Sequence, residues 1–335
     1  MKMKKISLIV FLLVLIAGFS FAQEPQVYIA GYDGNDAVYW HNDGVKTTRY
    51  VLPKESETAQ ANAIAVSDSD IYIVGTDGND AVYWLNGNRI VLPTIGNRAE
   101  ANDIAISGSN VYIVGTDGGD AVCWHNGNCI VLPKTSEWGA SADSISISGS
   151  NIYITGNEGS IPVYWLNFSR KIILPDFYNM PLESSAIIVI GSNVHRIGSA
   201  WGMEHPTVAL YWYNGQITIL PIDGYYDSFA RGIAVDGSNV YISGSVRQYI
   251  SHERHAVYWH NENIVFLEKN NPYWEKIYSK SNAITVLNSN IYIAGSILED
   301  WDHRYRAVYW YNGERVRLPV SARTVSDALA ITVVP

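Results

Sequence analysis

The sequence predicts an all-β fold: a single seven-bladed β-propeller of four-stranded antiparallel blades, with the ring closed by the C-terminal strand joining the N-terminal blade. Three recurring features predict it. A Tyr-Trp pair recurs, a short β-type run ending in Gly precedes it, and a run ending in Leu-Pro follows it. Four short strands in each unit of 40 to 51 residues are typical of a propeller blade. The repeated tryptophans are Trp40, Trp84, Trp124, Trp165, Trp212, Trp259 and Trp310.

The turns inside each unit support four strands. The first two strands are joined by a Gly-Ser-Asn type of turn. The last two are joined by Asn-Gly, as at Asn86-Gly87 and Asn126-Gly127. Asn-Gly is a strong hairpin signal because both turn residues need positive φ.

The two ends of the repeat predict how the ring closes. After its leader, the chain opens directly with a second strand at 27–29, and it ends with an unpartnered first strand at 327–331. The last strand is therefore expected to complete the first blade, which removes an exposed sheet edge.

Composition and charge limit the functional classes. Of 335 residues, 47% are apolar and only 16% are charged, which excludes a disordered chain. A formal net charge of −9 disfavours nucleic acid and anionic membranes as partners. We expect a monomer with no nucleic-acid partner and no membrane insertion.

The first segment has the pattern of a secretory signal peptide. Residues 1–5 are basic, residues 6–18 are almost wholly apolar, and Ser20 and Ala22 place small side chains before a cleavage site. The apolar run is shorter than the ~20 residues of a transmembrane helix. We expect residues 1–22 to be removed and residues 23–335 to form the propeller, secreted or periplasmic.

The second unit carries a further pattern at 61–64, 72–75, 81–87 and Leu92: Ala-x-x-Ile, Val-x-Gly, Ala-x-x-Trp-x-x-Gly and Leu. In this pattern the chain resembles the secreted bacterial repeat proteins of the HAF type. The resemblance implies an extracellular propeller and no known activity.

Residues kept in nearly every unit are interpreted as packing residues. Each Trp can bury about 150–250 Å² between blades, so we do not interpret the Tyr-Trp pairs as sugar-stacking sites. Short Asp-Gly turns such as 77–80 supply too few of the 6–8 oxygens that calcium needs. Cys123 and Cys129 flank an Asn-Gly turn, and pairing of Trp124 with Cys129 points the two thiols to opposite faces. We expect no metal and no cofactor.

Function is expected where the repeat is broken. Between their second and third strands, units 5 to 7 have ten or eleven residues (199–208, 245–255, 296–306), whereas units 1 to 4 have five. Long loops on a rigid scaffold often carry binding residues, and aromatic residues beside Arg are enriched at binding hot spots. The candidate ligand-binding residues are Trp201, His205, Arg231, Arg247, Tyr249, His252, His255, Trp274, Trp301, His303, Arg304 and Tyr305.

These residues support two functional hypotheses. The leading one is an exported, non-catalytic binding module that recognises a protein or glycan ligand through the face over blades 5 to 7. The alternative is an extracellular glycan-active enzyme, a lyase or hydrolase, with His, Tyr and Arg as acid and base on the same face. No motif sets a nucleophile or a carboxylate pair, so no catalytic residue is assigned. A transition-metal site is a further alternative, in which His252-x-x-His255 would act with His205, His303, Glu253 or Asp302.

Two further positions depart from the repeat. His195 and Arg196 replace a Tyr-Ile pair, and a buried Arg196 would need a carboxylate or carbonyl partner, or access to water. We interpret it as a local salt bridge. In each unit, the residue two positions before the inner-strand Ile is expected to lie at the channel mouth on the built-up face. Arg231 occupies this position in unit 6 and is a candidate anion anchor. The ring of residues at this position is Asn62, Asn102, Asp143, Ser185, Arg231, Asn282 and Asp327.

Overall fold

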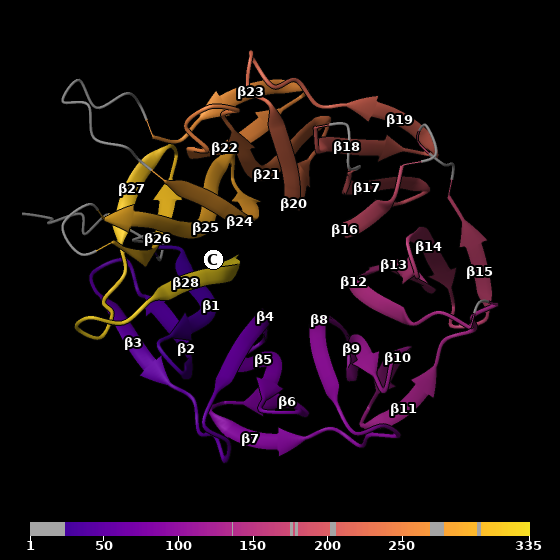
Figure 1. Cartoon of the computed structure of the whole chain (residues 1–335). Helices are drawn as coiled ribbons and strands as arrows, with labels where there is room; N and C mark the ends of the chain where they lie inside the picture. Colours follow the sequence, from indigo (N-terminus) through magenta and orange to yellow (C-terminus); the bar gives the residue numbers. More distant parts are fainter. Residues whose placement is uncertain are drawn as a thin grey trace, which may run out of the picture.

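The computed structural model describes residues 24–135, 137–174, 177, 180–201, 206–268, 278–299 and 303–335. The predicted signal peptide, 1–22, lies outside these residues. The described chain forms seven four-stranded antiparallel sheets arranged around a central channel, which confirms the predicted fold class (Figure 1).

Each of blades 1 to 7 takes its strands in chain order, except that the inner strand of blade 1 comes from the C-terminus. Blades 1 to 4 contain β1 (Gln26–Asp33), β2 (Asp36–Asn42), β3 (Thr47–Val51), β4 (Ala59–Ser67), β5 (Asp70–Asp77), β6 (Asp80–Leu85), β7 (Asn88–Val91), β8 (Ala99–Ser107), β9 (Asn110–Asp117), β10 (Asp120–His125), β11 (Asn128–Val131), β12 (Ala140–Ser148), β13 (Asn151–Glu158), β14 (Ile161–Leu166) and β15 (Arg170–Ile173). Blades 5 to 7 and the closing strand are β16 (Leu182–Ile190), β17 (Asn193–Ala200), β18 (Val208–Tyr213), β19 (Gln216–Ile219), β20 (Asp227–Asp236), β21 (Asn239–Arg247), β22 (Arg254–His260), β23 (Asn263–Phe266), β24 (Ser279–Leu287), β25 (Asn290–Glu299), β26 (Arg304–Tyr311), β27 (Glu314–Arg317) and β28 (Ser326–Val334).

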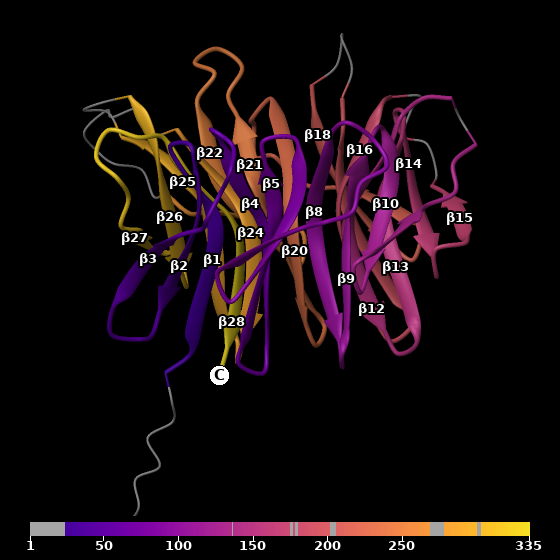
Figure 2. The ribbon, with the colours of Figure 1, turned by 90° about the horizontal axis from the view of Figure 1, so that it is seen from below.

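The ring closes as predicted. Strand β28 pairs antiparallel with β1, with Ile331 opposite Ile29 and Val334 opposite Gln26. Figure 2 shows the described ends of the chain on one face and the raised hairpins on the other. We call these the short-turn face, which carries the Asn-Gly turns, and the built-up face. Asn86 and Gly87 have φ values of 51° and 82°, as the hairpin prediction requires.

The repeated Trp and Leu-Pro form one device that joins neighbouring blades. The Trp84 indole Nε1 donates to the Pro53 carbonyl of the preceding blade at 2.8 Å. Four other blades repeat this bond: Trp40 to Pro319, Trp124 to Pro93, Trp165 to Pro133 and Trp259 to Pro221. None of the seven indole side chains is more than 1% exposed. The packing interpretation of the tryptophans is therefore confirmed.

At the end of blade 6, Glu268 occupies the place of the Pro in the Leu-Pro of other units, and it contacts the Trp of blade 7. Trp310 Nε1 donates instead to a carboxylate oxygen of Glu268 at 2.9 Å, and Arg315 lies 3.1 Å from the other oxygen. The side chain of Glu268 thus replaces the proline carbonyl as the acceptor.

A β-bulge in each inner strand creates the channel ring. In β4 the register shifts between Ala61 and Ala63, so Asn62 is the extra residue. The bulged residues of the seven inner strands line the central channel: Asn62, Asn102, Asp143, Ser185, Arg231, Asn282 and Leu329. The prediction of Asp327 was wrong, because the bulge of β28 lies two residues further along. Asp327 instead pairs with Lys280.

The acids that recur in the short Asp-Gly turns have a structural role. Asp77 is fully buried, and its oxygens accept hydrogen bonds from the Glu55 and Ser56 backbone N–H groups at 2.7 and 2.9 Å. Arg89 Nε donates to the same carboxylate. Two backbone N–H groups and the Arg89 side chain therefore hold the Asp77 carboxylate in place. Cys123 and Cys129 are free thiols, and Cys129 lies opposite Trp124 as predicted.

Candidate functional site

The built-up face is made mainly of extended hairpins rather than long loops. Strand β21 continues to Arg247 and β22 resumes at Arg254, so the connecting loop is only 248–253. Strands β25 and β26 likewise run to Glu299 and from Arg304. The expected loops 245–255 and 296–306 are thus strand at both ends, over 245–247, 254–255, 296–299 and 304–306, because the pairing of the blade continues above the ring (Figure 2).

The predicted site residues divide into several groups. His205, Trp274 and Trp301 lie outside the described residues. Arg247 Nε donates to Asp227 at 2.6 Å, and Asp227 also accepts from the Thr207 backbone N–H, so Arg247 anchors the base of its hairpin.

His255 also has a packing role. Its ring meets Tyr225 edge-on, with centroids 5.3 Å apart, and it lies near Phe266. Burial lowers the pKa of His255, so it stays neutral. Among the residues that the structure describes, no three His, Cys, Asp or Glu side chains gather as metal ligands would.

Other predicted residues lie toward the ends of the hairpins. Trp201 is 47% exposed and Tyr249 is 65% exposed, and the Tyr249 ring centroid lies 4.7 Å from that of Tyr226. His252 and His303 are exposed, whereas Arg304 is half-buried on β26.

Arg231 and Tyr305 belong to a cationic and aromatic group at the channel mouth. We call this group, Phe229, Arg231, Arg254, Lys280 and Tyr305, the channel-mouth cluster. Arg254 Cζ lies 5.0 Å from the centroid of the Phe229 ring, and Lys280 Nζ lies 5.8 Å from that of Tyr305. Sequence reasoning passed over Arg254, although it lies in the same insertion as Arg247.

Acids lie near both arginines of the cluster: the charge of Asp227 acts on Arg254, and Asp143 and Glu183 line the cavity beside Arg231. Burial and then the nearby charge of Arg231 lower the pKa of Arg254. Lys280 has Asp327 as its partner. Within the described ranges, neither Arg231 nor Arg254 forms a salt bridge. The two neighbouring guanidinium groups thus repel one another and have no direct carboxylate partner among the described residues.

A polar cavity of about 480 Å³ opens beside Arg231. Its lining includes Asn102, Asp143, Glu183, Phe229 and Asn282. Burial raises the pKa of Asp143 to about 7, and Asn157 Nδ2 donates to its carboxyl at 3.1 Å. Near neutral pH this carboxyl can thus either donate or accept a hydrogen bond.

Arg196 does not form the predicted salt bridge. It is 1% exposed, and its guanidinium donates to the hydroxyls of Thr155 and Ser184 at 2.6 to 2.9 Å. Its Cζ lies 5.5 Å from the Trp212 ring centroid. Burial lowers the pKa of Arg196 to about 9. Hydroxyls and an aromatic face replace the expected carboxylate or carbonyl, because Thr155 of β13 and Ser184 of β16 both place their hydroxyls beside Arg196.

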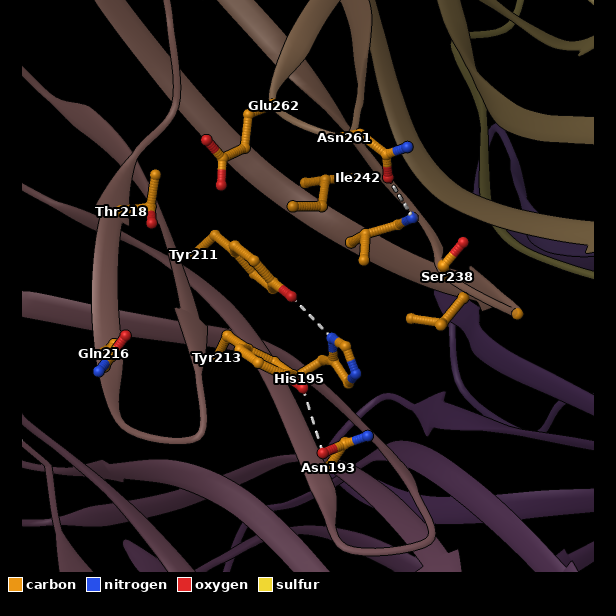
Figure 3. A pocket seen from close by; sticks show the side chains of 13 residues that line it. Asn193, His195, Tyr211, Tyr213, Gln216, Thr218, Ser238, Ile242, Asn261 and Glu262 are labelled. Atoms are coloured by element: carbon orange, nitrogen blue, oxygen red, sulfur yellow. Dashed lines mark hydrogen bonds between the residues drawn. The ribbon is translucent and has the colours of Figure 1, made fainter.

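Sequence reasoning missed a second cavity, on the short-turn face. It lies between blades 5 and 6 and has a volume of about 700 Å³ (Figure 3). His195, Tyr211, Tyr213, Thr218 and Glu262 contribute to its lining. The sequence feature that could have indicated this cavity is His195, which stands where the second strands of the other blades have Tyr.

No protein-family model and no curated protein matches the chain. Among solved structures, the chain is similar to the extracellular domain of a protein described as a one component system from B. thetaiotaomicron, with a TM-score of 0.48 and 11% identity. The alignment covers 81% of this chain and 37% of that chain, so this chain spans little more than a third of its length. The part of the chain described here has no helix long and apolar enough to cross a membrane.

Proposed function

We propose that the chain is an exported, non-catalytic binding module that recognises an acidic glycan at the channel mouth. The observation that carries the proposal is the neighbouring pair Arg231 and Arg254, neither of which forms a salt bridge among the described residues of a chain of net charge −9. Like charges repel at short range, and a bound carboxylate or sulfate would convert this repulsion into attraction. Arg also binds carboxylates through two parallel hydrogen bonds.

The cavity beside Arg231 suits the rest of a sugar. Asn102 and Asn282 offer amide donors and acceptors, and Asp143 can do both near neutral pH. Phe229 lines the same cavity and supplies an aromatic surface for the apolar face of a ring. A protein ligand with an acidic segment is the competing partner on the same face.

The enzyme alternative gains less support. Burial raises the pKa of Tyr305, which makes this Tyr a poor general base near neutral pH. The His255 ring packs against Tyr225 and Phe266. Membership of the HAF-type repeat proteins, and export itself, continue to rest on sequence patterns.

A binding experiment on the chain from Gln23 tests the proposal. We expect tetragalacturonate to bind with an affinity that falls as salt rises, and neutral oligosaccharides to bind this face more weakly. Arg231→Ala and Arg254→Ala should each weaken tetragalacturonate binding by at least about tenfold. Lys46→Ala removes an exposed cation on the short-turn face and should leave it unchanged. Binding of an acidic protein but of no acidic glycan would favour the competing partner.

A further inference from the structure

We propose that the short-turn face holds a second binding site, for a neutral saccharide, in the cavity between blades 5 and 6. Its volume of about 700 Å³ lies within the roughly 300–1,000 Å³ range of small-molecule sites. Residues of β17, β18 and β19 line it from blade 5, and residues of β20, β21 and the β22–β23 turn line it from blade 6. This site is independent of the channel-mouth cluster and of the acidic ligand proposed there.

The same groove is filled between blades 3 and 4. There Phe168, in the β14–β15 turn, packs on Tyr112 and His125, with ring centroids 6.2 and 6.3 Å apart. The corresponding turn of blade 6 carries Glu262 in place of Phe168, and the two residues have φ values of 67° and 64°. The turn of blade 6 therefore does not fill the groove with an aromatic ring, as the longer turn of blade 4 does; four other blades carry Gly at the position of Glu262.

The second cause is an exchange of two rings in blade 5. In blade 1, Tyr28 of the second strand stacks flat on His41 of the third strand, with centroids 4.3 Å apart and an interplanar angle of 6°. In blade 5 the order is reversed: His195 is on the second strand and Tyr213 is on the third. Their centroids are 5.0 Å apart and the planes are tilted by 48°. The smaller imidazole thus occupies the inner position, where the other blades carry a phenol.

A buried hydrogen-bonded pair supplies fixed polar groups to the cavity. His195 Nδ1 and Tyr211 Oη are 2.7 Å apart, and the two side chains point toward one another in Figure 3. Burial lowers the pKa of His195 and raises the pKa of Tyr211 to about 12, so both are neutral at physiological pH. If Tyr211 donates, the imidazole keeps its Nε2 hydrogen, and if His195 donates, the phenol hydrogen is spare. Either tautomer therefore leaves one donor for a ligand.

The chemistry of the lining selects a neutral, hydroxyl-rich ligand. No Lys or Arg is among the described residues that line the cavity, and Glu262 lies at its edge, so an anion would have no charged partner. Sugar hydroxyls can donate to Glu262 and exchange hydrogen bonds with amides such as Asn193 and Gln216. Val240 and Ile242, with the tyrosine rings, offer an apolar surface to the face of a sugar ring.

The test is calorimetric titration of the chain from Gln23 with neutral tetraoses of glucose, xylose, mannose and N-acetylglucosamine. We expect at least one of these probes to bind. Glu262→Phe, which copies the turn of blade 4, should fill the cavity and weaken binding by at least about tenfold. Thr218→Ile should act likewise, because Thr218 lies opposite Tyr211 where blade 2 has Ile90 opposite Tyr83. Thermal unfolding of each variant checks that it is folded.

Two controls separate this site from the channel mouth. Glu262→Gln keeps the space and a hydrogen-bonding group, so it should bind within a few-fold of the unmodified chain. Arg231→Ala should leave the neutral probe unaffected, even if it abolishes binding of tetragalacturonate. The proposal fails if no tetraose binds at millimolar concentration, if both filled variants bind as well as the parent, or if Arg231→Ala removes the binding.

Discussion

The indole Nε1 of Trp40 donates a hydrogen bond to the carbonyl oxygen of Pro319, 279 residues later, at 2.7 Å. This bond joins the first blade to the last, next to the pairing of β1 with β28. It is the same bond that joins Trp84 to Pro53 within one continuous stretch of chain. Ring closure thus reuses the contact between neighbouring blades, although the loop-closure entropy that opposes it is larger.

Blade 7 offers a direct test of this contact. Replacing Glu268 with Ala removes the acceptor of the buried Trp310 Nε1 and the partner of Arg315. We expect Glu268→Ala to lower the free energy of unfolding by about 1–3 kcal/mol, because a buried donor is left unsatisfied. Denaturant unfolding measures the change. Glu268→Gln keeps an acceptor oxygen and should recover most of the loss; equal destabilisation by Ala and Gln would contradict the role of this bond.

The recurring Gly near the end of each second strand leads to a different prediction. A Cβ on Gly75 would lie 1.9 Å from the Gln60 carbonyl oxygen, across the bulge at Asn62. Gly75→Ala should therefore cost more than about 3 kcal/mol or prevent folding, because backbone atoms would have to move. Gly108→Asn is the matched control: its φ is 56°, and Asn288 occupies the equivalent turn at 51°. A stable Gly75→Ala protein with an unchanged melting temperature would show that the bulge tolerates a side chain.

Much of the fold was predictable because each blade repeats the same local chemistry. Asn-Gly turns, strand-ending glycines and the Trp positions depend on near neighbours or on one neighbouring blade. The error at Asp327 arose where the repeat is split between the two ends of the chain. Leu329, not Asp327, is the residue two positions before the inner-strand Ile331, and the bulge falls there.

The Asp77 carboxyl of blade 2 should make the stability of the protein depend on pH in acid. Burial raises the pKa of this carboxyl, but hydrogen bonds from Glu55 and Ser56 and the charge of Arg89 outweigh burial, so its pKa lies below the usual value. The stabilisation is therefore present above the unfolded-state pKa of about 4 and is lost as pH falls through the lower folded-state pKa. Asp77→Asn should cost about 1–3 kcal/mol at pH 7. Chemical unfolding at several pH values should show this difference shrinking below about pH 4; a constant difference would argue against an ionised native carboxylate.

The candidate sites were less predictable than the fold. Arg231 was identified because it alone breaks a small polar ring, but the position of Arg254 over Phe229 depends on how far β21 and β22 extend above the ring. The second cavity depends on residues from two blades, His195 and Glu262, and the departure of each one from its repeat does not by itself indicate a shared groove. Only the packed structure shows that both leave the same groove open.

Asp143 couples the channel cavity to pH. Burial raises its pKa to about 7, so between about pH 4 and 7 the folded chain binds more protons than the unfolded chain. The contribution of this group to stability is therefore greatest at low pH and is lost as pH rises through 7. Asp143→Asn cannot ionise and should gain roughly 1–2 kcal/mol relative to the parent between pH 5 and 8, after allowing for water in the channel.

The same ionisation should affect the proposed acidic ligand. Asp143 lines the cavity beside Arg231, so its charged form would repel a carboxylate bound there. We expect tetragalacturonate affinity to fall as pH rises from 6 to 8 in the parent and to stay level in Asp143→Asn. Calorimetric titration at constant ionic strength measures both. Parallel pH profiles for the two proteins would place the ligand away from Asp143, whereas a flat profile only in the variant ties the cavity to the recognition of the anion.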